Sequence, residues 1–464
     1  MVSMKQEQET EAPMIRPVED FFDKEYRDFA LYTITFRALP SVIDGFKPTQ
    51  RKAAFIADRV WRRGDEKPMK VFQLAGRVAA EAFYHHGNAS LESTIIGMAQ
   101  TFKNSMPIFH GIGQFGSLRV PEAGAPRYVG VKFNENFRLL YKDFELVTPQ
   151  IEEGEQIEPI FFLPIIPTVL LNGGSGIAVG FATNIMNRNP IDLIDACFDV
   201  LNGNEPRELF PWVKGFTGAY SRSPDSDNGW IIKGVYNVKN MSTVEITDIP
   251  PSLTYEKYES YLDNLVEKGI LTSYDDMSSD KVHYVLKFPR QTLSDIISRN
   301  KLEDILKLQD RESENLTTLG PDRKLLIFDK PADIVKFFVD FRLGYYQKRK
   351  DFMIKTIGDE LDVLSNRARF IKSIVDGSLQ VNARAKKLIE DDLAAGGYLQ
   401  HDGSFTYLTS MPIHSLTKEK MEELLKTVKN KNTELKQIKS ATPRDLYSND
   451  LTSLRQSIIK SGVV

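Results

Sequence analysis

Apolar residues between Pro331 and Val375 recur at helical spacing in two consecutive series, and this run limits the possible fold more than any other feature of the chain. Proline is favoured at the first position of a helix. Apolar side chains follow it at Ile334, Phe337, Phe338, Phe341 and Tyr345, and then at Ile354, Ile357, Leu361, Leu364, Ala368, Ile371 and Val375. The second series alternates steps of three and four residues, which is the heptad spacing of a helix that packs along a partner helix. We predict one helix of about 45 residues, roughly 65–70 Å long at about 1.5 Å per residue, that ends at Asp376-Gly377.

A second amphipathic helix is predicted after Ser415. Its apolar residues recur at Met421, Leu424, Val428, Leu435 and Ile438. The two helices are able to pair antiparallel, with residues 394–413 and an Asp402-Gly403 turn at the tip. A long helix can also be an ordinary core helix. Because polar residues cover most of the circumference of this one, we favour a coiled-coil arm formed by residues 329–464.

The rest of the chain divides by pattern into three parts. Residues 1–20 are polar and acidic with two prolines, which is typical of a flexible tail. Residues 21–150 show short helical stretches with a small strand component, and residues 151–328 turn to strand-like, β-branched and aromatic patterns. The expected helices span 26–36, 48–63 and 91–102, and the expected strands span 230–238, 244–249 and 282–288. We therefore predict an α+β multidomain fold.

Composition excludes several classes of protein. The 464 residues are 41% hydrophobic and 27% charged, which is typical of a folded soluble chain. No run approaches the ~18 apolar residues that a bilayer span needs, and the N-terminus lacks the hydrophobic core of a signal peptide. Cys197 is the only cysteine, so an intrachain disulfide and a Cys-based zinc site are excluded. We expect a cytoplasmic protein without a membrane partner.

The charged residues are unevenly distributed. The 60 basic and 63 acidic side chains nearly cancel, so any site for a polyanion must be local. Basic residues concentrate between Arg37 and Lys70, whereas acidic residues gather at Glu152, Glu153, Glu155 and Glu158. A basic patch in a near-neutral chain suits a confined nucleic-acid site. On charge alone, a solvated helix face remains the more common explanation.

Two glycine-rich segments are poor nucleotide sites. Residues 111–116 match GxGxxG, but Pro121 and Pro126 forbid the helix that a dinucleotide-binding motif must begin. Residues 173–180 lack the Lys-Ser/Thr ending of a phosphate-binding loop, so tight backbone packing is the better interpretation. The six histidines show no metal-ligand spacing, and we predict no metal site in this chain.

A dense set of polar side chains remains in the first half of the chain. Its members are Arg37, Lys47, Arg51, Lys52, His85, His86, Ser117, Arg119, Arg127 and Tyr128. A tyrosine, with an ordinary pKa of about 10, is a poor nucleophile unless cations and a base assist it. Arg127 directly precedes Tyr128 in a Pro-Arg-Tyr turn and supplies one such cation.

Five motifs resemble, in their order and approximate spacing, the cleavage core of the type IIA DNA topoisomerases. They are Arg37-Ala-Leu-Pro with Lys47-Pro-Thr-Gln-Arg-Lys52, Tyr84-His-His-Gly with the residues up to Gln100, Ile112-Gly-Gln-Phe-Gly116, Ala125-Pro-Arg-Tyr128, and the segment from Leu163 to Gly180. They are most similar to the medium subunits of T4-like bacteriophage topoisomerases, and also similar to gyrase A and the eukaryotic cleavage core. The resemblance is strong over 37–184 and weak beyond.

This resemblance implies an arrangement of domains. It implies a winged-helix (CAP-like) DNA-gate domain at 21–150 that holds the tyrosine, and an α/β tower domain at 151–328. For residues 329–464 it implies a coiled-coil arm that ends in a C-gate dimerisation tip.

The resemblance also implies that Tyr128 attacks a DNA phosphodiester, becomes linked to the 5′ phosphate and frees a 3′ hydroxyl. Arg127 and Arg51 would neutralise the phosphate, with Lys52 assisting. His86 would hydrogen-bond the reacting phosphate or the tyrosyl oxygen. Fixed cations suit this chemistry because an in-line displacement develops charge on the nonbridging oxygens.

Other residues of the set are expected to hold the flanking DNA. They are Arg37, Lys47, His85, Ser117 and Arg119. Ile177 lies where the family inserts an isoleucine between base pairs to bend the DNA, which apolar wedges do at the cost of unstacking. The alternative for Ile177 is an ordinary core residue.

The implied assembly is a homodimer that binds double-stranded DNA and joins a separate ATPase and toprim subunit, which would bring Mg²⁺ and ATP. We find no ATPase signature and no toprim-like acidic constellation in the sequence. Two alternatives stay open. A non-enzymatic dimeric DNA clamp requires an inert Tyr128, and a tyrosine recombinase or relaxase is less favoured because no histidine occurs in a His-x-x-Arg or His-hydrophobe-His pattern.

A drug response follows from the same resemblance. In gyrase A the helix after His-Pro-His-Gly carries a serine and an acidic residue that hold the water shell of a quinolone-bound Mg²⁺. The corresponding residues here are Ala89 and Ser93. We expect quinolones to stabilise cleaved DNA poorly, because an ionised acceptor makes the stronger hydrogen bond.

Overall fold

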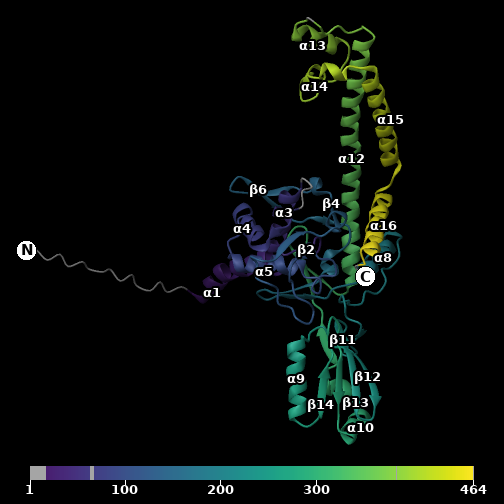
Figure 1. The fold of residues 1–464 in the computed structure, drawn as a ribbon. Coiled ribbons are helices and arrows are strands. Elements are labelled where there is room, and N and C mark those ends of the chain that lie inside the picture. The colour runs from purple at the N-terminus through teal and green to yellow at the C-terminus, as the bar shows by residue number, and fades with distance from the viewer. Residues whose placement is uncertain (1–16, 63–66, 383, 463–464) are drawn as a thin grey trace, which may run out of the picture. The chain divides into compact units, whose positions relative to one another are not determined.

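The computed structural model describes residues 17–62, 67–382 and 384–462. These residues form two compact units (Figure 1). The first unit comprises the chain up to Phe338 and the residues from Leu454 onward, and the second comprises Val339–Ser453. Two helices, α12 (Pro331–Val375) and α16 (Pro443–Ser461), contribute to both units.

The described chain begins with a run of helical turns. The run consists of α1 (Val18–Phe21), η1 (Phe22–Tyr26), α2 (Arg27–Thr33) and η2 (Ile34–Ala38). Glu19 and Asp20 lie in the first turn, where carboxylates are stabilised by the positive end of the helix dipole. The structure therefore corrects the predicted tail at residues 18–20, while residues 1–16 lie outside the described residues.

Three helices and a three-stranded antiparallel sheet follow this run. They are α3 (Pro48–Trp61), α4 (Val71–Glu81) and α5 (Asn88–Ala99), with β1 (Met69–Lys70), β2 (Phe109–Ile112) and β3 (Gly130–Phe133) in the order β1-β3-β2. α3 begins at Pro48 as predicted, and the Lys47 N–H donates to the Gln50 side chain at 2.9 Å. α5 lies slightly before its predicted range, because Gly87 turns the chain with φ +87° and Gln100 is already extended.

Aromatic packing fixes the sheet against α3. The Trp61 ring lies 5.1 Å from that of Phe133 and 6.3 Å from that of Phe109, measured between ring centroids. All three side chains are buried. The strands β2 and β3 are thereby held in place, and the loop that joins them, residues 113–129, carries Tyr128.

The next part of the first unit is built from short elements. Its helices are α6 (Phe137–Leu140), η3 (Phe144–Leu146), α7 (Thr168–Leu171) and α8 (Pro190–Leu201). Its strands are β4 (Tyr141–Lys142) with β7 (Leu163–Pro164), β5 (Pro149–Glu152) with β6 (Glu155–Pro159), and β8 (Gly174–Ile177) with β9 (Ala182–Ile185). A Cβ atom on Gly173 would lie 2.3 Å from the carbonyl oxygen of Ile185, and one on Gly176 would lie 2.2 Å from that of Ala38. The predicted tight backbone packing of residues 173–180 is confirmed at these two positions.

Larger antiparallel sheets follow. One has the order β10-β11-β16 (Ala219–Arg222, Gly229–Lys233, Gln309–Ser313), another the order β12-β13-β15-β14 (Val235–Asn240, Thr243–Asp248, Tyr284–Lys287, Ser273–Asp276), and β17 (Leu316–Leu319) pairs with β18 (Leu325–Phe328). The predicted strand 230–238 is divided in two at Gly234, whose N–H donates to Leu308 O at 2.7 Å and where a Cβ would lie 2.6 Å from Asp248 O. β11 and β12 belong to two different sheets, although they are separated by Gly234 alone. Because both have strand-like composition and follow each other so closely, the sequence pattern predicts a single strand.

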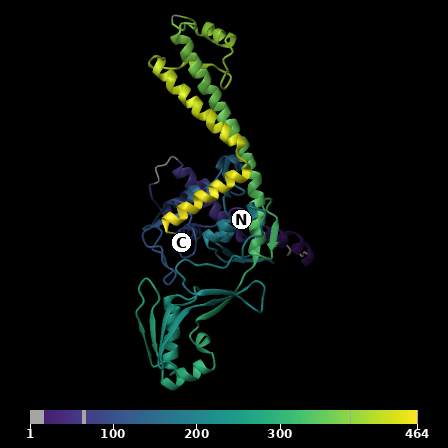
Figure 2. The same cartoon turned by 90° about the vertical axis from the view of Figure 1, so that its right-hand side faces the viewer.

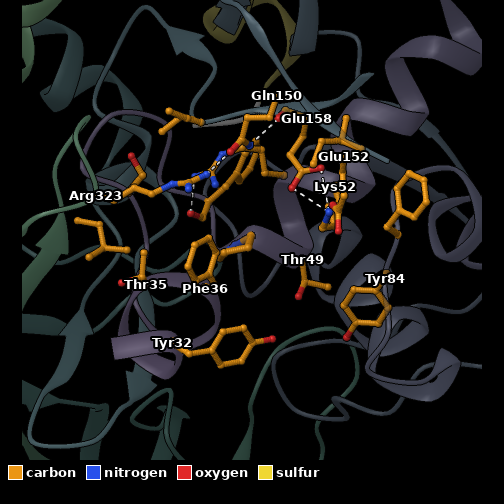
Figure 3. Close-up of a pocket in the computed structure, with 18 of the residues that line it drawn as sticks. Tyr32, Thr35, Phe36, Thr49, Lys52, Tyr84, Gln150, Glu152, Glu158 and Arg323 are labelled. Carbon is orange, nitrogen blue, oxygen red and sulfur yellow. Dashed lines mark hydrogen bonds and ion pairs between the residues drawn. The ribbon is translucent and has the colours of Figure 1, made fainter. Parts of the chain in front are cut away.

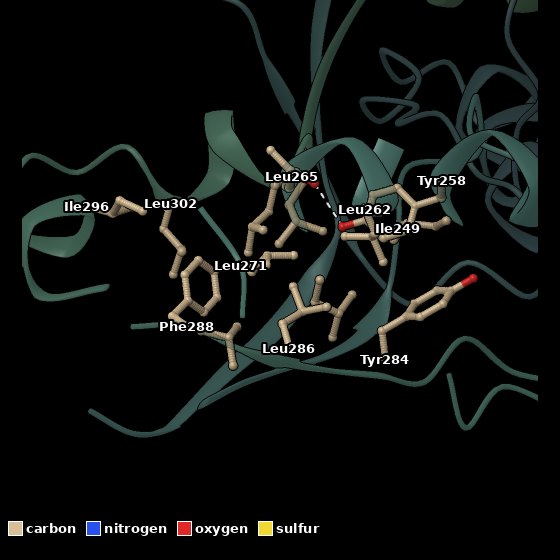
Figure 4. Close-up of a cluster of buried hydrophobic side chains, with 14 of the residues drawn as sticks. Ile249, Tyr258, Leu262, Leu265, Leu271, Tyr284, Leu286, Phe288, Ile296 and Leu302 are labelled. Carbon is tan, nitrogen blue, oxygen red and sulfur yellow. Dashed lines mark hydrogen bonds between the residues drawn. The ribbon is translucent and has the colours of Figure 1, made fainter. Parts of the chain in front are cut away.

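Helices cover the four-stranded sheet. They are α9 (Tyr255–Glu267), α10 (Arg290–Ser298) and α11 (Leu302–Ile305). Leu262 and Leu265 of α9 face Leu286 of β15 in a buried hydrophobic cluster (Figure 4). We call this sheet with its helices the four-stranded domain.

The helix of 45 residues, α12, stands where the heptad pattern predicts it, and its residues from Val339 onward belong to the second unit. Helix α15 (Lys418–Ser440) lies beside it (Figure 2). Lys350 Nζ donates to Ala441 O, whereas Glu360 pairs with Lys431, so the two helices run antiparallel. Ile357, Leu361 and Ile438 form the buried seam between them.

The remaining elements of the second unit lie between these helices in sequence. They are α13 (Lys386–Ala395), α14 (Thr406–Thr409) and η4 (Ile413–Ser415). They enclose a small core around Phe370, Leu393 and Leu408. Asp402 and Gly403 both have positive φ and form the predicted turn between His401 and Ser404.

Candidate active site

Tyr128 lies at the surface, at the end of the loop that joins β2 to β3. Its side chain is 68% exposed. Its N–H donates to Ala125 O at 2.8 Å, and the next residue, Val129, is buried and accepts from Val71 N. The phenol is thus presented to solvent while the backbone on either side of it is held by hydrogen bonds.

Two cations lie next to Tyr128. The guanidinium carbon of Arg127 lies 5.0 Å from the centroid of the Tyr128 ring. Lys70 Nζ donates to the Tyr128 carbonyl oxygen at 2.5 Å. A phenolate and a bound phosphate are both stabilised by fixed positive charge, so the surroundings of this tyrosine suit a nucleophile.

A groove of about 800 Å³ holds a second group of predicted residues. Arg37, Lys47 and His86 line it, together with Ser90 and Lys103. The ring Nε2 of His86 lies 2.9 Å from Oη of Tyr32, which fixes the imidazole at the edge of the groove. Burial lowers the pKa of Lys47.

The β8–β9 hairpin closes one side of this groove. Lys47 Nζ donates to the Ser175 carbonyl oxygen at 2.7 Å, across the bare Cα of Gly176. Ile177 follows at the end of β8 with 89% of its surface exposed. The alternative of an ordinary core residue is therefore wrong for Ile177.

Arg51 is buried beneath the groove and is already paired. Its Nε lies 2.7 Å from Asp44 Oδ2, and its Nη2 donates to Asp44 Oδ1 and to Phe46 O. Burial lowers the pKa of Arg51, but the Asp44 carboxylate outweighs this and raises it overall. The expectation that Arg51 touches phosphate is corrected for this structure, because its positive charge is neutralised by Asp44 and its side chain is only 8% exposed.

Lys52 is held in the same way in a neighbouring pocket (Figure 3). Its Nζ donates to Ala82 O at 2.6 Å and lies 3.1 Å from the Glu158 carboxylate. Burial raises the pKa of Glu158, and Lys52 opposes that shift. Lys52 therefore anchors the end of α4, ahead of His85 and His86, which are both exposed.

Arg119 is the clearest correction among the predicted DNA contacts. It is 6% exposed and pairs with Asp248 at 2.6 Å. Its guanidinium also donates to the carbonyl oxygens of residues 249, 250 and 253. Burial lowers its pKa against the opposing effect of Asp248. Since these donor contacts are internal and the guanidinium is buried, the side chain is unavailable to DNA, whereas the nearby Ser117 is exposed.

The structure thus brings some predicted residues together and separates others. Arg37, Lys47 and His86 share one groove, and His85 lines the neighbouring pocket. Tyr128 and Arg127 line neither of them.

Four side chains at the site escape prediction from the sequence. Tyr32 binds His86, and Asp44 binds Arg51. Lys70 binds the Tyr128 carbonyl oxygen, and Glu158 binds Lys52. The two members of each pair lie seven or more positions apart in the chain. The sequence therefore shows that these side chains are charged or aromatic, but not which residue each of them binds. Asp44 alone carries a signal, since it lies in the Asp-Gly step just before Lys47-Pro48.

Within the described ranges, no group of three or more His, Cys, Asp or Glu side chains is placed to hold a metal ion. None of the described helices is long and apolar enough to span a bilayer.

The fold is that of a known class of enzyme domain. The chain superimposes on the crystal structure of the Plasmodium falciparum topoisomerase II DNA-binding, cleavage and re-ligation domain with a TM-score of 0.85 and 31% sequence identity, over 95% of this chain and 64% of that one. The class is therefore that of type II topoisomerase cleavage domains.

The chain belongs to the A-subunit family of DNA gyrase/topoisomerase IV, whose sequence model matches residues 37–453. It is 33% identical to the DNA topoisomerase medium subunit of Enterobacteria phage T4 over 95% of this chain and 99% of that relative. It is 30% identical to the mitochondrial DNA topoisomerase 2 of Dictyostelium discoideum and 31% identical to the DNA topoisomerase 2 of Plasmodium falciparum. The chain spans about a third of the length of these two longer relatives, 35% and 34%.

Proposed function

We propose that this chain is the DNA cleavage and rejoining subunit of an ATP-dependent type IIA DNA topoisomerase. The observation that carries the proposal is Tyr128, an exposed tyrosine under the guanidinium of Arg127, in a member of this family. The near-complete overlap with the phage T4 medium subunit supports a subunit of this size.

In the proposed reaction the Tyr128 oxygen attacks a backbone phosphorus in line with the leaving oxygen. The new bond joins Oη to the 5′ phosphate, and the bond that breaks releases the 3′ oxygen, which takes up a proton to become a hydroxyl. The phenol proton is lost to a base. Rejoining is the reverse displacement, so no bond energy is lost and no net hydrolysis occurs.

The chain's own residues supply charge and position in this step. Arg127 neutralises the phosphate beside Tyr128, because its guanidinium already lies against that ring. His86 hydrogen-bonds a phosphate oxygen from the groove, and Arg37 and Lys47 hold the flanking backbone there. Arg51 and Lys52 act as positioning residues, since they anchor the turn before Lys47 and the end of α4.

Tyr128 lies outside the groove that contains His86, so we propose that the groove and the tyrosine contact different stretches of DNA backbone in one chain. His85 and Ser117 are further contacts, because both are exposed near these sites. Ile177 is the wedge between base pairs. Its exposure at the end of a rigid, glycine-packed hairpin is what an intercalating side chain requires.

The domains take corresponding roles. Residues 21–150 form a winged-helix DNA-gate domain, 151–328 a tower domain, and 329–464 a coiled-coil arm with a dimerisation tip. Exposed apolar side chains at the tip, among them Leu399 and Ile413, support a homodimer there. Light scattering of the purified chain at micromolar concentration should give the mass of a dimer, and a monomer would contradict this part of the proposal.

The Mg²⁺ and ATP that the family uses belong, in this proposal, to a separate ATPase and toprim subunit that joins the dimer in the cytoplasm, which is that of the host cell if a phage encodes the chain. The relative that supports a separate partner is the phage T4 protein, whose name is that of one subunit among several.

The decisive experiment is covalent capture. The chain, its partner subunit, Mg²⁺ and end-labelled duplex DNA are mixed and stopped with denaturant, and protein-linked DNA is measured. The wild-type chain should give 5′-linked product, and Tyr128→Phe should give none while binding DNA with similar affinity, because only the nucleophilic oxygen is removed. Equal product from Tyr128→Phe would contradict the assignment, and no product from either would favour the alternative of a non-enzymatic clamp.

A further inference from the structure

The loop that carries Tyr128 contacts the four-stranded domain through the side chain and the backbone of Arg119. Arg119 lies in this loop, nine residues before the tyrosine. Its guanidinium makes four hydrogen bonds of 2.6–3.2 Å with residues 248–253, and its carbonyl oxygen accepts from Tyr255 N at 3.0 Å. The contact therefore joins the end of β13 and the start of α9 to the loop.

The acidic partner of Arg119 is built into the four-stranded domain. Asp248 is the last residue of β13 and is 3% exposed. It also accepts from the backbone and hydroxyl of Thr217, at 2.7 and 2.9 Å, and from Ile249 N. Both charges are thus buried with their hydrogen bonds satisfied, which makes the arrangement geometrically strict and costly to disturb.

The loop is also anchored to the helices of the first half of the chain. At its tyrosine end, Val71 N donates to Val129 O at 3.1 Å, Phe72 N to Pro126 O at 3.3 Å, and Lys70 Nζ to Tyr128 O. Residues 113–129 contain no helix or strand. Gln100, just beyond α5, donates from its side chain to the carbonyl oxygens of Phe115 and Pro121 at 2.9 and 3.1 Å. The loop is therefore held on one side by Gln100 and the start of α4, and on the other side by Arg119, which binds the four-stranded domain.

We infer that Arg119 is a positioning residue that transmits the placement of the four-stranded domain to Tyr128. An in-line attack on phosphorus tolerates little displacement of the reacting atoms. A rigid link to the loop therefore determines whether the Tyr128 oxygen is in position to react. DNA that engages the four-stranded domain would thereby favour cleavage some distance away. This inference rests on the proposed role of Tyr128 as the nucleophile.

The test compares two double variants that each remove an ion pair without leaving a lone charge. The first is Arg119→Met with Asp248→Asn, in which the amide keeps an oxygen for Thr217. The matched control is Lys233→Met with Glu303→Gln, which removes an ion pair of 2.7 Å between β11 and α11 that does not touch the loop. Circular dichroism and thermal melting establish that both are folded.

Hydrogen exchange gives the first readout, and it does not depend on activity. In the Arg119 variant the amides of residues 117–129 should exchange at least about tenfold faster, while those of α3 and α5 keep wild-type protection. In the control the loop should exchange as in the wild type. Unchanged exchange of the loop in the Arg119 variant would overturn the link, as would an equal acceleration throughout α3 and α5.

Covalent capture by the complete enzyme gives the second readout. The yield is compared on duplexes of about 15 and about 40 base pairs, roughly 50 and 135 Å long at about 3.4 Å per base pair, both centred on one cleavage site. Wild type and control should favour the long duplex, and the Arg119 variant should lose this preference, with a drop of at least about tenfold confined to the long duplex. A preference that persists in the Arg119 variant, or a wild type that captures both duplexes equally, overturns the coupling.

Failure of the proposed function has a different signature. If Tyr128→Phe captured as much DNA as wild type, the nucleophile would be wrong while the exchange result still decided whether Arg119 holds the loop.

Discussion

The guanidinium of Arg51 contacts both carboxylate oxygens of Asp44, with Nε 2.7 Å from Oδ2 and Nη2 2.9 Å from Oδ1. Asp44 also accepts from the backbone N–H groups of Phe46 and Phe162. This buried pair fixes the turn that leads into α3 and so the place of Lys47 in the groove.

Removing only one of the two charges of the Arg51–Asp44 pair should destabilise the folded chain. We expect Arg51→Met to lower the free energy of unfolding by about 3–5 kcal/mol, because it leaves the Asp44 carboxylate buried without its cation. The double variant Arg51→Met with Asp44→Asn should recover much of that loss, since no charge stays buried. Urea unfolding measures both, and a double variant no more stable than the single one would show that charge pairing is not what holds this turn.

Arg127 should matter for chemistry and not for folding. Its side chain is exposed over the Tyr128 ring, so Arg127→Ala should leave the melting temperature within a degree or so of wild type while slowing covalent capture about 10²–10³-fold, as for other charge-stabilising donors. Arg59→Ala is the matched control, because Arg59 is also exposed and lies 5.6 Å from the ring of Phe55. Equal slowing in both variants would point to a general electrostatic effect on DNA binding.

Ile177 should affect the bending and cleavage of DNA but not the stability of the folded chain. Ile177→Ala should leave thermal stability unchanged because the side chain is 89% exposed, but it should reduce bending of the bound duplex and lower covalent capture at least about tenfold, since a wedge offsets an unstacking cost of a few kcal/mol. Energy transfer between dyes at the duplex ends reports the bend. Ile327→Ala, at a 66% exposed position on β18, is the control and should behave as wild type. Normal bending by the Ile177 variant would remove the wedge assignment.

Drug response offers a further test, on the first turns of α5. Ala89 and Ser93 are both exposed there and lie four positions apart, on one face of the helix. Fluoroquinolones should therefore trap little cleaved DNA with the wild type, and Ala89→Ser with Ser93→Asp should increase trapping because an ionised acceptor is restored. The assay is run beside a typical gyrase, and equal trapping by that gyrase and the wild-type chain would contradict the role given to this helix.

The elements that the sequence predicted well are those determined by local pattern. The 45-residue helix follows from a heptad series that starts at a proline, and α3 starts at Lys47-Pro48, because both signals act within a turn or two of the chain. The identity of Tyr128 as the candidate nucleophile likewise comes from a short motif, in which the neighbouring arginine is one residue away.

The partners of the basic residues were decided only by the tertiary structure. Arg37, Arg51 and Arg119 look alike in the sequence, yet one is exposed in a groove, one is neutralised by Asp44, and one joins the tyrosine loop to Asp248 over 129 positions. A sequence states that a guanidinium is present but not which carboxylate meets it, because that choice depends on which distant segments the folded core brings within hydrogen-bond distance. Burial then decides the outcome, since a cation taken out of water must be paired internally, and one left at the surface remains available to DNA.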